Sequence, residues 1–347
     1  MSFRSEKFGK YILRPAEPSD SPAIREIFGS GSFSGELNVQ FLRGEDPLVS
    51  FEADGERAHI LVADDTEAGR TVAVGGAVVR TEFLNGERAK CAYLTGLKVH
   101  ADYRGRLSFI PRAYRIMGEL VSDCAFTYTT ILDSNTAVIR MLEKRRRNMP
   151  EYRFLGHYTT FCIGGGKPVV PVERGNTDGF DELMERHFSA KSLTPCDSGL
   201  AGFGKKEFYA VRGENGEIQA CCFIGDQSAT KYYRMCSYGG IYRLVSRFPT
   251  RLLGYPPFPE PGSVIRDGIV SYLYVRGNDK ALSRRFLLSA AHESGFPMLL
   301  WGGFENDPLC EAVGRMRTVR YGSRLYEAVW NEPHSIDGVI GVEAGLL

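Results

Sequence analysis

The sequence lacks the features that mark membrane-spanning and exported proteins. It has no uncharged apolar run near 18 residues long, so no membrane-spanning helix is predicted. The first twenty residues, MSFRSEKFGKYILRPAEPSD, contain no apolar core of the kind that export signals need. The eight cysteines form no CxxC pair and stand mostly in apolar, strand-like stretches, which is typical of buried free thiols. We therefore expect a cytoplasmic protein with no disulfide and no metal site.

The sequence also lacks an excess of charge of either sign. It has 43 Lys and Arg residues against 42 Asp and Glu residues, so no overall field would draw it to nucleic acid or to an anionic membrane. Its one basic run, KRRR at 144–147, ends a predicted helix, where cations complement the helix dipole. Walker loops, dinucleotide fingerprints and nucleophile elbows are absent. This balance favours a small neutral or zwitterionic substrate, with neither nucleic acid nor membrane as partner. Nothing in the sequence indicates an oligomeric state.

The length and the order of predicted elements indicate two tandem domains. A chain of 347 residues exceeds one ordinary core. Three glycines at 164–166 precede a proline-punctuated segment, which is typical of a domain boundary. We expect domains at 1–165 and 166–347, because the second half repeats the order of elements of the first. The predicted fold class is α+β, with two copies of one fold, each a mixed, mostly antiparallel sheet flanked by helices.

Within the first half, strands are predicted from Tyr11 and in three β-rich runs, the last two joined by the hairpin dipeptide Asn85-Gly86. Helices are predicted after Asp20, more weakly over 36–42, and near 108–123 and 135–144. One segment of the second half, 238–263, is aromatic, basic and proline-rich and has no counterpart in the first. Two interpretations stay open for it: packing between the domains, or a wall over a substrate cleft.

The segment YLTGLKVHADYRGR (93–106) resembles the signature of the GNAT superfamily of acyl-CoA-dependent N-acetyltransferases. Leu97-Lys98-Val99 matches the strand end of that signature, and Arg104-Gly105 matches its Q/R-x-x-G-x-G/A loop. A splayed strand leaves main-chain groups for the pantetheine amides, and a helix start attracts the CoA pyrophosphate. The resemblance implies acetyl-CoA or CoA as a bound substrate, no metal, and the binding residues Leu97, Lys98, Val99, Arg104, Gly105, Arg106, Leu107, Ser108 and Asn135.

The sequence departs from the family pattern at both the loop and the acid. Leu107 and Phe109 stand where glycines let the loop approach the phosphates, and Leu142 stands where a tyrosine commonly protonates the departing thiolate. Val313 stands at the corresponding place in the second copy. A replacement acid or base has to come from the cleft itself. The candidates are Tyr93, His100, Tyr128 and Glu82, and each of them has an alternative interpretation as a packed or surface residue.

The second copy lacks the loop altogether, since Arg276-Gly277 directly follows Val275 and no glycine comes after. We expect a degenerate copy that has lost cofactor binding. Our first hypothesis is an N-acetyltransferase that moves acetyl from acetyl-CoA to a small amine by direct attack. The missing glycines and tyrosine leave open a non-catalytic tandem GNAT-fold binding protein. An aminoacyl-transferring relative shares the layout, but its tRNA substrate needs a basic channel that the neutral composition disfavours.

Overall fold

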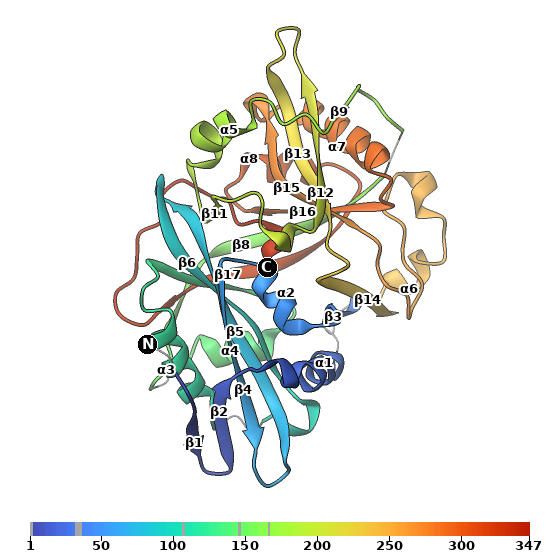
Figure 1. The fold of residues 1–347 in the computed structure, drawn as a ribbon. Coiled ribbons are helices and arrows are strands. Elements are labelled where there is room, and N and C mark those ends of the chain that lie inside the picture. Colours follow the sequence, from blue (N-terminus) through green and yellow to red (C-terminus); the bar gives the residue numbers. More distant parts are fainter. Residues whose placement is uncertain (1–2, 32–36, 106–107, 145–146, 166) are drawn as a thin grey trace.

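The β-rich runs of both halves join in one mixed sheet that extends through the whole molecule (Figure 1). The computed structural model describes residues 3–31, 37–105, 108–144, 147–165 and 167–347. The first half contributes the strands β1 (Glu6–Phe8), β2 (Tyr11–Pro15), β4 (Arg57–Asp65), β5 (Arg70–Leu84), β6 (Glu87–Val99), β7 (Phe126–Leu132) and β8 (Glu151–Gly164). The second half contributes β9 (Glu173–Arg174), β12 (Lys205–Arg212), β13 (Ile218–Asp226), β15 (Gly268–Val275), β16 (Met298–Phe304) and β17 (Thr318–Val329).

The last strand of each half lies among the strands of the other half. Along the sheet the order is β1-β2-β4-β5-β6-β7-β17-β8-β16-β15-β13-β12-β9. β17 pairs antiparallel with β7 and with β8, and β8 pairs antiparallel with β16. The two halves therefore share one continuous hydrogen-bonded sheet through exchanged strands, a feature that the sequence did not predict.

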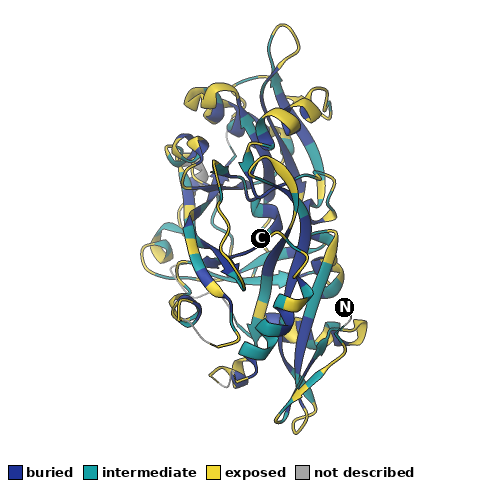
Figure 2. Cartoon of the chain, turned by 90° about the vertical axis from the view of Figure 1, so that its left-hand side faces the viewer, coloured by how far each residue is buried: buried dark blue, intermediate teal, exposed yellow. Residues whose placement is uncertain are grey.

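Helices cover both faces of the sheet, and the alternation of side chains along β5 shows which helix lies on which face. Ala73 and Ala77 pack in a core with α3 (Ile110–Leu120) and α4 (Thr136–Leu142). Val74 and Val78 pack in another core with α1 (Ser21–Gly29) and α2 (Pro47–Ala53). The second half is covered by α5 (Phe180–Leu183), α7 (Lys280–Ser294) and α8 (Pro308–Gly314). Figure 2 shows that the buried residues are concentrated in the strands.

The predicted hairpin at Asn85-Gly86 is confirmed. Its two residues have φ values of 52° and 88°, as the tight turn between β5 and β6 requires. The crossover is confirmed as well, because α3 leads from β6 to a parallel strand, β7. All eight cysteines are free thiols.

The weak helix predicted over 36–42 is wrong. Residues 37–43 form a strand, β3 (Leu37–Arg43), which pairs antiparallel with β14 (Lys231–Tyr238) of the second half; Glu36 lies outside the described residues. Pairing between distant parts of the chain outweighs the local helical preference here. The helix of this region comes later, as α2, where Asp46 caps Leu48 N at 3.0 Å and Pro47 is the first helical residue.

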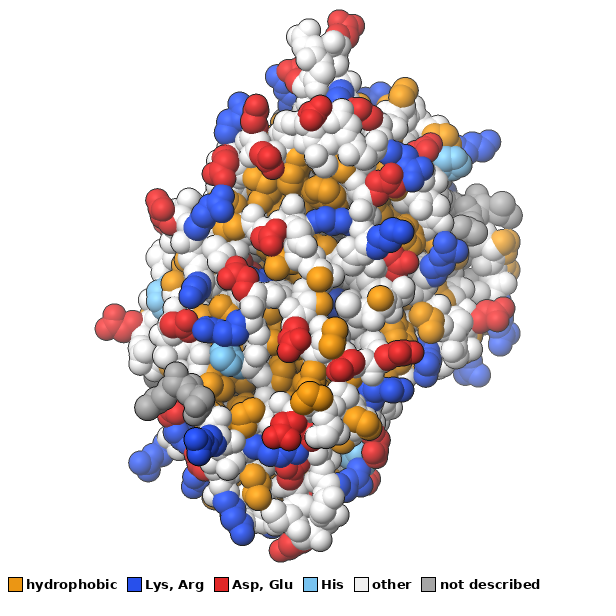
Figure 3. All heavy atoms as spheres, viewed as in Figure 1, with side chains coloured by type: hydrophobic (Ala, Val, Ile, Leu, Met, Phe, Trp, Pro, Cys, Tyr) orange, Lys and Arg blue, Asp and Glu red, His pale blue; other side chains and the backbone are white. Residues whose placement is uncertain are grey.

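Among the residues that the structure describes, no helix is long and apolar enough to cross a membrane. Basic and acidic side chains are interspersed over the face seen in Figure 3. The remaining elements are the short strands β10 (Lys191–Ser192), β11 (Thr194–Pro195) and β18 (Val339–Ile340), and the helix α6 (Tyr242–Val245), which lies in the segment 238–263. β10 pairs with β18, and β11 pairs with β5.

Candidate active site

The site begins where β6 and β7 separate. The two strands pair in parallel only from Cys91–Phe126 to Tyr93–Tyr128. One further link, from the Thr129 hydroxyl to the Leu94 carbonyl at 2.8 Å, closes the narrow end of the split. Beyond it, β6 has no strand neighbour on this side among the described residues. Its main-chain groups are therefore open to a ligand.

A bulge in β6 produces this split. Gly96 and Leu97 together face the single residue Gly75 of β5, because the register shifts between Val74 and Gly76. Gly96 has φ +69°, and a Cβ at this position would lie 2.6 Å from the ring of Phe51. Only glycine fits both the backbone conformation and the space.

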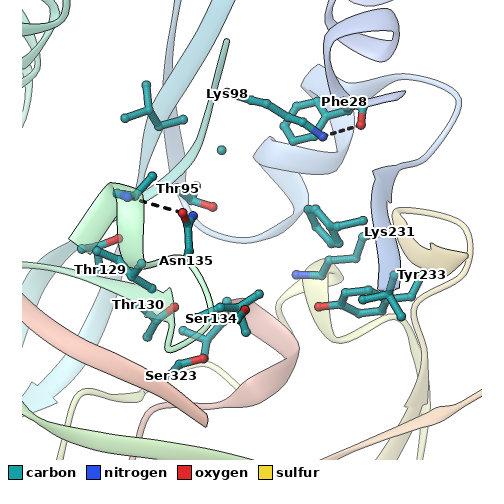
Figure 4. A pocket seen from close by; sticks show the side chains of 18 of the residues that line it. Phe28, Thr95, Lys98, Thr129, Thr130, Ser134, Asn135, Lys231, Tyr233 and Ser323 are labelled. Carbon is teal, nitrogen blue, oxygen red and sulfur yellow. Dashed lines mark hydrogen bonds between the residues drawn. The ribbon is translucent and has the colours of Figure 1, made fainter. Parts of the chain in front are cut away.

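A cavity of about 1120 Å³ opens at the split and continues into the second half of the chain. In Figure 4, Thr129, Thr130, Ser134 and Asn135 lie on one side, while Phe28, Lys98, Lys231 and Tyr233 lie opposite. The cavity thus joins the first half's α4 to the ribbon formed by β3 and β14.

Most of the predicted cofactor-binding residues line this cavity. Leu97, Lys98, Val99, Arg104, Gly105 and Asn135 do so. Ser108 is exposed and does not line it, while Arg106 and Leu107 lie outside the described residues. Asn135 is also the N-cap of α4, since its side chain accepts from Val138 N at 3.4 Å.

Lys98 lines the cavity, and its ammonium group already makes two hydrogen bonds within the protein. Its ammonium donates to the backbone carbonyls of Phe28 and Gly31, the latter at 3.1 Å, and so holds the end of α1 against β6. Burial, together with the charge of Arg104, lowers its pKa to about 8. Lys98 therefore positions the wall of the cavity.

Of the four predicted catalytic side chains, only Tyr93 lines the cavity. It is buried at the narrow end of the split, with its hydroxyl 2.7 Å from that of Thr130. Burial raises the pKa of Tyr93, so the phenol stays protonated at neutral pH.

The other three do not line the cavity. Tyr128 is fully buried and donates to Glu82 at 2.8 Å, and Arg80 donates to both of them. His100 lies outside the cavity, with its Nε2 3.3 Å from Glu26 Oε1. The structure therefore brings Glu82 and Tyr128 together in a buried network with Arg80, and it leaves His100 apart from both groups.

Leu142, which replaces the tyrosine of the family pattern, is buried at the cavity wall. Two other tyrosines are exposed to the cavity on this side. The Tyr152 hydroxyl donates to that of Tyr114 at 2.9 Å, and burial raises the pKa of Tyr114 to about 12. Neither was among the candidates, because their proximity depends on packing between α3 and β8.

The far part of the cavity, which we call the distal chamber, lies between the β3–β14 ribbon, residues 256–269 and the strands β16 and β17. It is apolar and aromatic, and Phe41, Tyr233, Phe258, Asp267, Leu300 and Tyr321 belong to its wall. The rings of Phe41 and Tyr233 are 5.3 Å apart. Tyr238, Tyr242 and residues 256–259 line the cavity, so part of the segment without a counterpart forms a wall of this chamber.

Sequence reasoning missed a buried group of three charged residues, Arg43, Asp54 and Lys231. Lys231 is buried and pairs with Asp54 at 2.7 Å, and Arg43 pairs with the other oxygen of Asp54 at 2.9 Å. Burial alone would raise the pKa of Asp54, but these two cations outweigh it and lower the pKa. Burial lowers the pKa of Lys231 to about 8. Each of the three charges stands in a mixed or polar stretch, and the pairing of Lys231 with Asp54 spans 177 residues, so no local signal in the sequence could have found it.

Asp267 was also missed. It directly precedes β15, and the chain before it runs alongside β14, where Ile265 N donates to Tyr233 O at 2.8 Å. Burial raises the pKa of Asp267 to about 7, with a small contribution from Asp226. A weakly acidic carboxyl in an apolar wall is the sort of group that takes part in proton transfer.

The second copy has a similar split, but its own chain fills it. β15 and β16 pair only at Gly268–Leu299 and Ile269–Leu300. Residues 344–346 then contact both strands. Glu343 accepts from Tyr272 N at 2.9 Å, and Tyr158 donates to Val342 O at 3.1 Å. The main-chain groups that β6 leaves open are thus partly satisfied in β15.

No group of three or more His, Cys, Asp or Glu residues suited to a metal ion occurs among the described residues. Comparison with protein-family models and with curated protein sequences gives no match. Comparison with solved structures finds proteins of similar fold.

N-myristoyltransferase of Saccharomyces cerevisiae with bound myristoyl-CoA superposes with a TM-score of 0.58 at 10% identity, over 97% of this chain and 90% of that one. A GCN5-related N-acetyltransferase of Anabaena variabilis gives a TM-score of 0.51 at 12% identity, over 92% of this chain and 73% of that one. Another, of Kribbella flavida, gives 0.50 at 17% identity, over 92% and 71%. The chain has the GNAT-type acyltransferase fold in tandem, and the predicted fold class is confirmed.

Proposed function

We propose that this protein is an acyl-CoA-dependent N-acyltransferase that transfers acetyl from acetyl-CoA to an amine. The observation that carries the proposal is the split between β6 and β7 at the mouth of the cavity. Pantetheine carries two amides, which pair with the open edge of β6 as an added strand would. The loop at Arg104-Gly105 and the start of α3 offer N–H groups and a favourable dipole to the pyrophosphate.

The first half, 1–165, holds the donor in this proposal, and the second half, 166–347, supplies the far wall. The filled split of the second copy supports this division, because residues 342–346 occupy the place that a second pantetheine would need. The distal chamber supports a short acyl group. A long hydrocarbon chain in it would bury the Asp267 carboxyl against methylene groups, which costs free energy that a polar ligand does not.

The chemistry proposed is direct attack of the amine on the thioester carbonyl, without a covalent enzyme intermediate. Tyr93 lies at the closed end of the split and keeps its proton at neutral pH. It is therefore the residue to which we assign protonation of the departing thiolate, in place of the tyrosine that Leu142 replaces.

Isothermal titration with acetyl-CoA tests the donor site in a matched pair of variants. Ala137 is the exposed second residue of α4 and lines the cavity, and Ala281 is the exposed second residue of α7, away from it. Ala137→Trp fills the donor cleft with an indole, so the acetyl-CoA affinity is expected to fall at least about tenfold. A loss of about 1.4 kcal/mol of binding free energy corresponds to a tenfold weaker affinity. Ala281→Trp is expected to bind like the unchanged protein.

Equal acetyl-CoA affinity in the two variants, or no heat with either acetyl-CoA or CoA, contradicts the proposed donor site. Binding of acetyl-CoA without transfer to any amine contradicts catalysis instead, and it favours the non-catalytic tandem GNAT-fold protein. Titration with myristoyl-CoA in parallel tests the acyl length, for which tighter binding of acetyl-CoA is expected.

A further inference from the structure

Among the described residues, one acidic side chain, that of Asp267, belongs to the wall of the distal chamber. Among the described residues that line the whole cavity, Asp267 is the only acidic one, whereas Lys98, Arg104, Lys231 and Arg320 are basic. Asp267 is partly buried and lines the cavity. A ligand that enters the chamber therefore meets one acidic side chain among those that the structure describes.

Asp267 has no hydrogen-bond or ion-pair partner within the described ranges. The titratable groups that interact with it electrostatically are the phenols of Tyr233 on β14 and Tyr321 on β17, the thiol of Cys162 on β8, and Asp226 at the end of β13. Lys231, the first residue of β14, is bound to Asp54 at 2.7 Å and takes part in a separate buried network. An unpaired carboxyl in such surroundings is costly, and the cost is recovered when a cation binds.

The rest of the chamber is suited to the apolar part of a ligand. Ile269, Met298, Leu300 and Val319 form one buried cluster, and Tyr242 and Phe258 pack against it with their rings 5.7 Å apart. Tyrosine rings around a carboxyl also attract an ammonium through their faces. The chamber combines a cation site with an apolar wall.

The chamber is connected to the reacting end of the donor site. Tyr93 at the closed end of the split is electrostatically coupled to Tyr233, and Tyr233 is coupled to Asp267. These residues line one continuous cavity. A ligand held at Asp267 consequently shares one cavity with the donor site.

We propose that the acceptor is a primary amine with an apolar or aromatic body, and that Asp267 of the second half binds its ammonium group and removes its first proton. This inference rests on the proposed acyl transfer. In the step, an ammonium proton passes to the Asp267 carboxylate, and the free amine forms the N–C bond to the thioester carbonyl. The C–S bond then breaks with its electron pair going to sulfur, Tyr93 protonates that sulfur, and the second nitrogen proton restores Tyr93. The products are an amide, CoA thiol and one proton.

The ionisation of the surrounding groups leaves Asp267 as the group that titrates near neutrality. Burial raises the pKa of Tyr233 and Tyr321 and raises the pKa of Cys162 to about 12, so all three stay neutral below pH 8. Burial raises the pKa of Asp267 to about 7. The carboxyl is therefore mostly neutral at pH 5.5 and mostly charged at pH 8, while an alkylammonium stays charged at both.

The test is a titration of the full chain, without CoA, using hexylamine, phenethylamine and tryptamine as probes and the alcohol of each skeleton as a neutral partner. At pH 8 we expect at least one amine to bind at least tenfold more tightly than its alcohol. Asp267→Asn is expected to remove that preference and to leave the alcohol affinity unchanged. Asp226→Asn, at an exposed carboxylate outside the cavity, is the matched control and is expected to keep the preference.

The pH dependence of the unchanged protein is a second measurement that needs no variant to fold. Amine affinity is expected to rise roughly tenfold from pH 5.5 to pH 8, as the carboxyl ionises, and alcohol affinity is expected to stay constant. The proposal is overturned if no amine of the set outbinds its alcohol, or if Asp267→Asn keeps the preference. Titration of the Asp267→Asn variant with acetyl-CoA is expected to give the affinity of the unchanged protein. If the variant binds acetyl-CoA normally, a lost or missing amine preference contradicts the acceptor site alone and leaves the proposed donor site intact.

Discussion

At the scale of single residues, the direction of a side chain decides which candidates can act. Tyr93 and Tyr128 are direct neighbours across the parallel pair β6–β7, and their rings are 5.2 Å apart. Yet the Tyr93 hydroxyl meets Thr130 in the cavity, whereas the Tyr128 hydroxyl meets Glu82 in the core. The sequence predicts that both tyrosines lie near the split. Both rings pack in one core with residues of the second half, and only the partners of their hydroxyl groups distinguish them.

The assigned role of Tyr93 predicts a change in turnover without a change in donor binding. Tyr93→Phe removes the hydroxyl and keeps the ring, so we expect kcat to fall about 100-fold, as is typical when a general acid is lost. The affinity for acetyl-CoA measured by titration should stay within about twofold, because the backbone of β6 provides the binding. The measurement is steady-state acetyl transfer to the amine that binds best.

Tyr128→Phe is the matched control, since it removes a hydroxyl of the neighbouring ring that does not line the cavity. It removes one hydrogen bond to Glu82 and one from Arg80, which keep their own ion pair, so we expect lower stability, by about 1–3 kcal/mol, and nearly unchanged kcat. If the two variants lose the same fraction of kcat, Tyr93 has no special role in the reaction.

At the scale of elements, local chemistry predicts the hairpin and the crossover well. Asn85-Gly86 joins β5 and β6 because both residues accept positive φ, and the apolar periodicity of 108–123 predicts the position of α3 to within a few residues. The β3–β14 ribbon was not predictable in this way. Its two strands stand almost 190 residues apart, and pairing with β14 outweighs the local helical preference.

The bulge of β6 is the element on which the donor site depends. Gly96→Ala should destabilise the fold by about 2–4 kcal/mol, because alanine is strained at φ +69° and its Cβ would overlap Phe51. It should also weaken acetyl-CoA binding, since relief of the overlap moves the open edge of β6. Urea unfolding and calorimetric titration measure the two effects.

Gly86→Ala provides the comparison, because Gly86 has φ +88° in the hairpin turn and nothing lies within 4 Å of the position of an added Cβ. It should cost only about 1–2 kcal/mol for backbone strain and leave acetyl-CoA binding intact. Equal losses of stability and of affinity in the two variants would show that the space beside Phe51 does not shape the split.

At the scale of the whole molecule, the sequence predicts two copies of one fold but not how they are joined. The pattern of β8 and of β17 is satisfied equally by pairing within its own half and by exchange, since both arrangements bury the same faces. The exchange makes the sheet continuous, and Figure 1 shows β17 and β8 crossing the middle of the molecule, close to the C-terminus. Residues 344–346 contact both strands of the second split, whereas the first split opens on the cavity.

The central claim is that acyl-CoA binds in the first split and not in the second. A crystal structure of the full chain grown with acetyl-CoA tests it most directly. The account predicts pantetheine density along β6 between Thr95 and Val99, with the thioester beside Tyr93 and the second split still filled by residues 342–346. Density along β15 beside Val275, with residues 342–346 displaced, would contradict it.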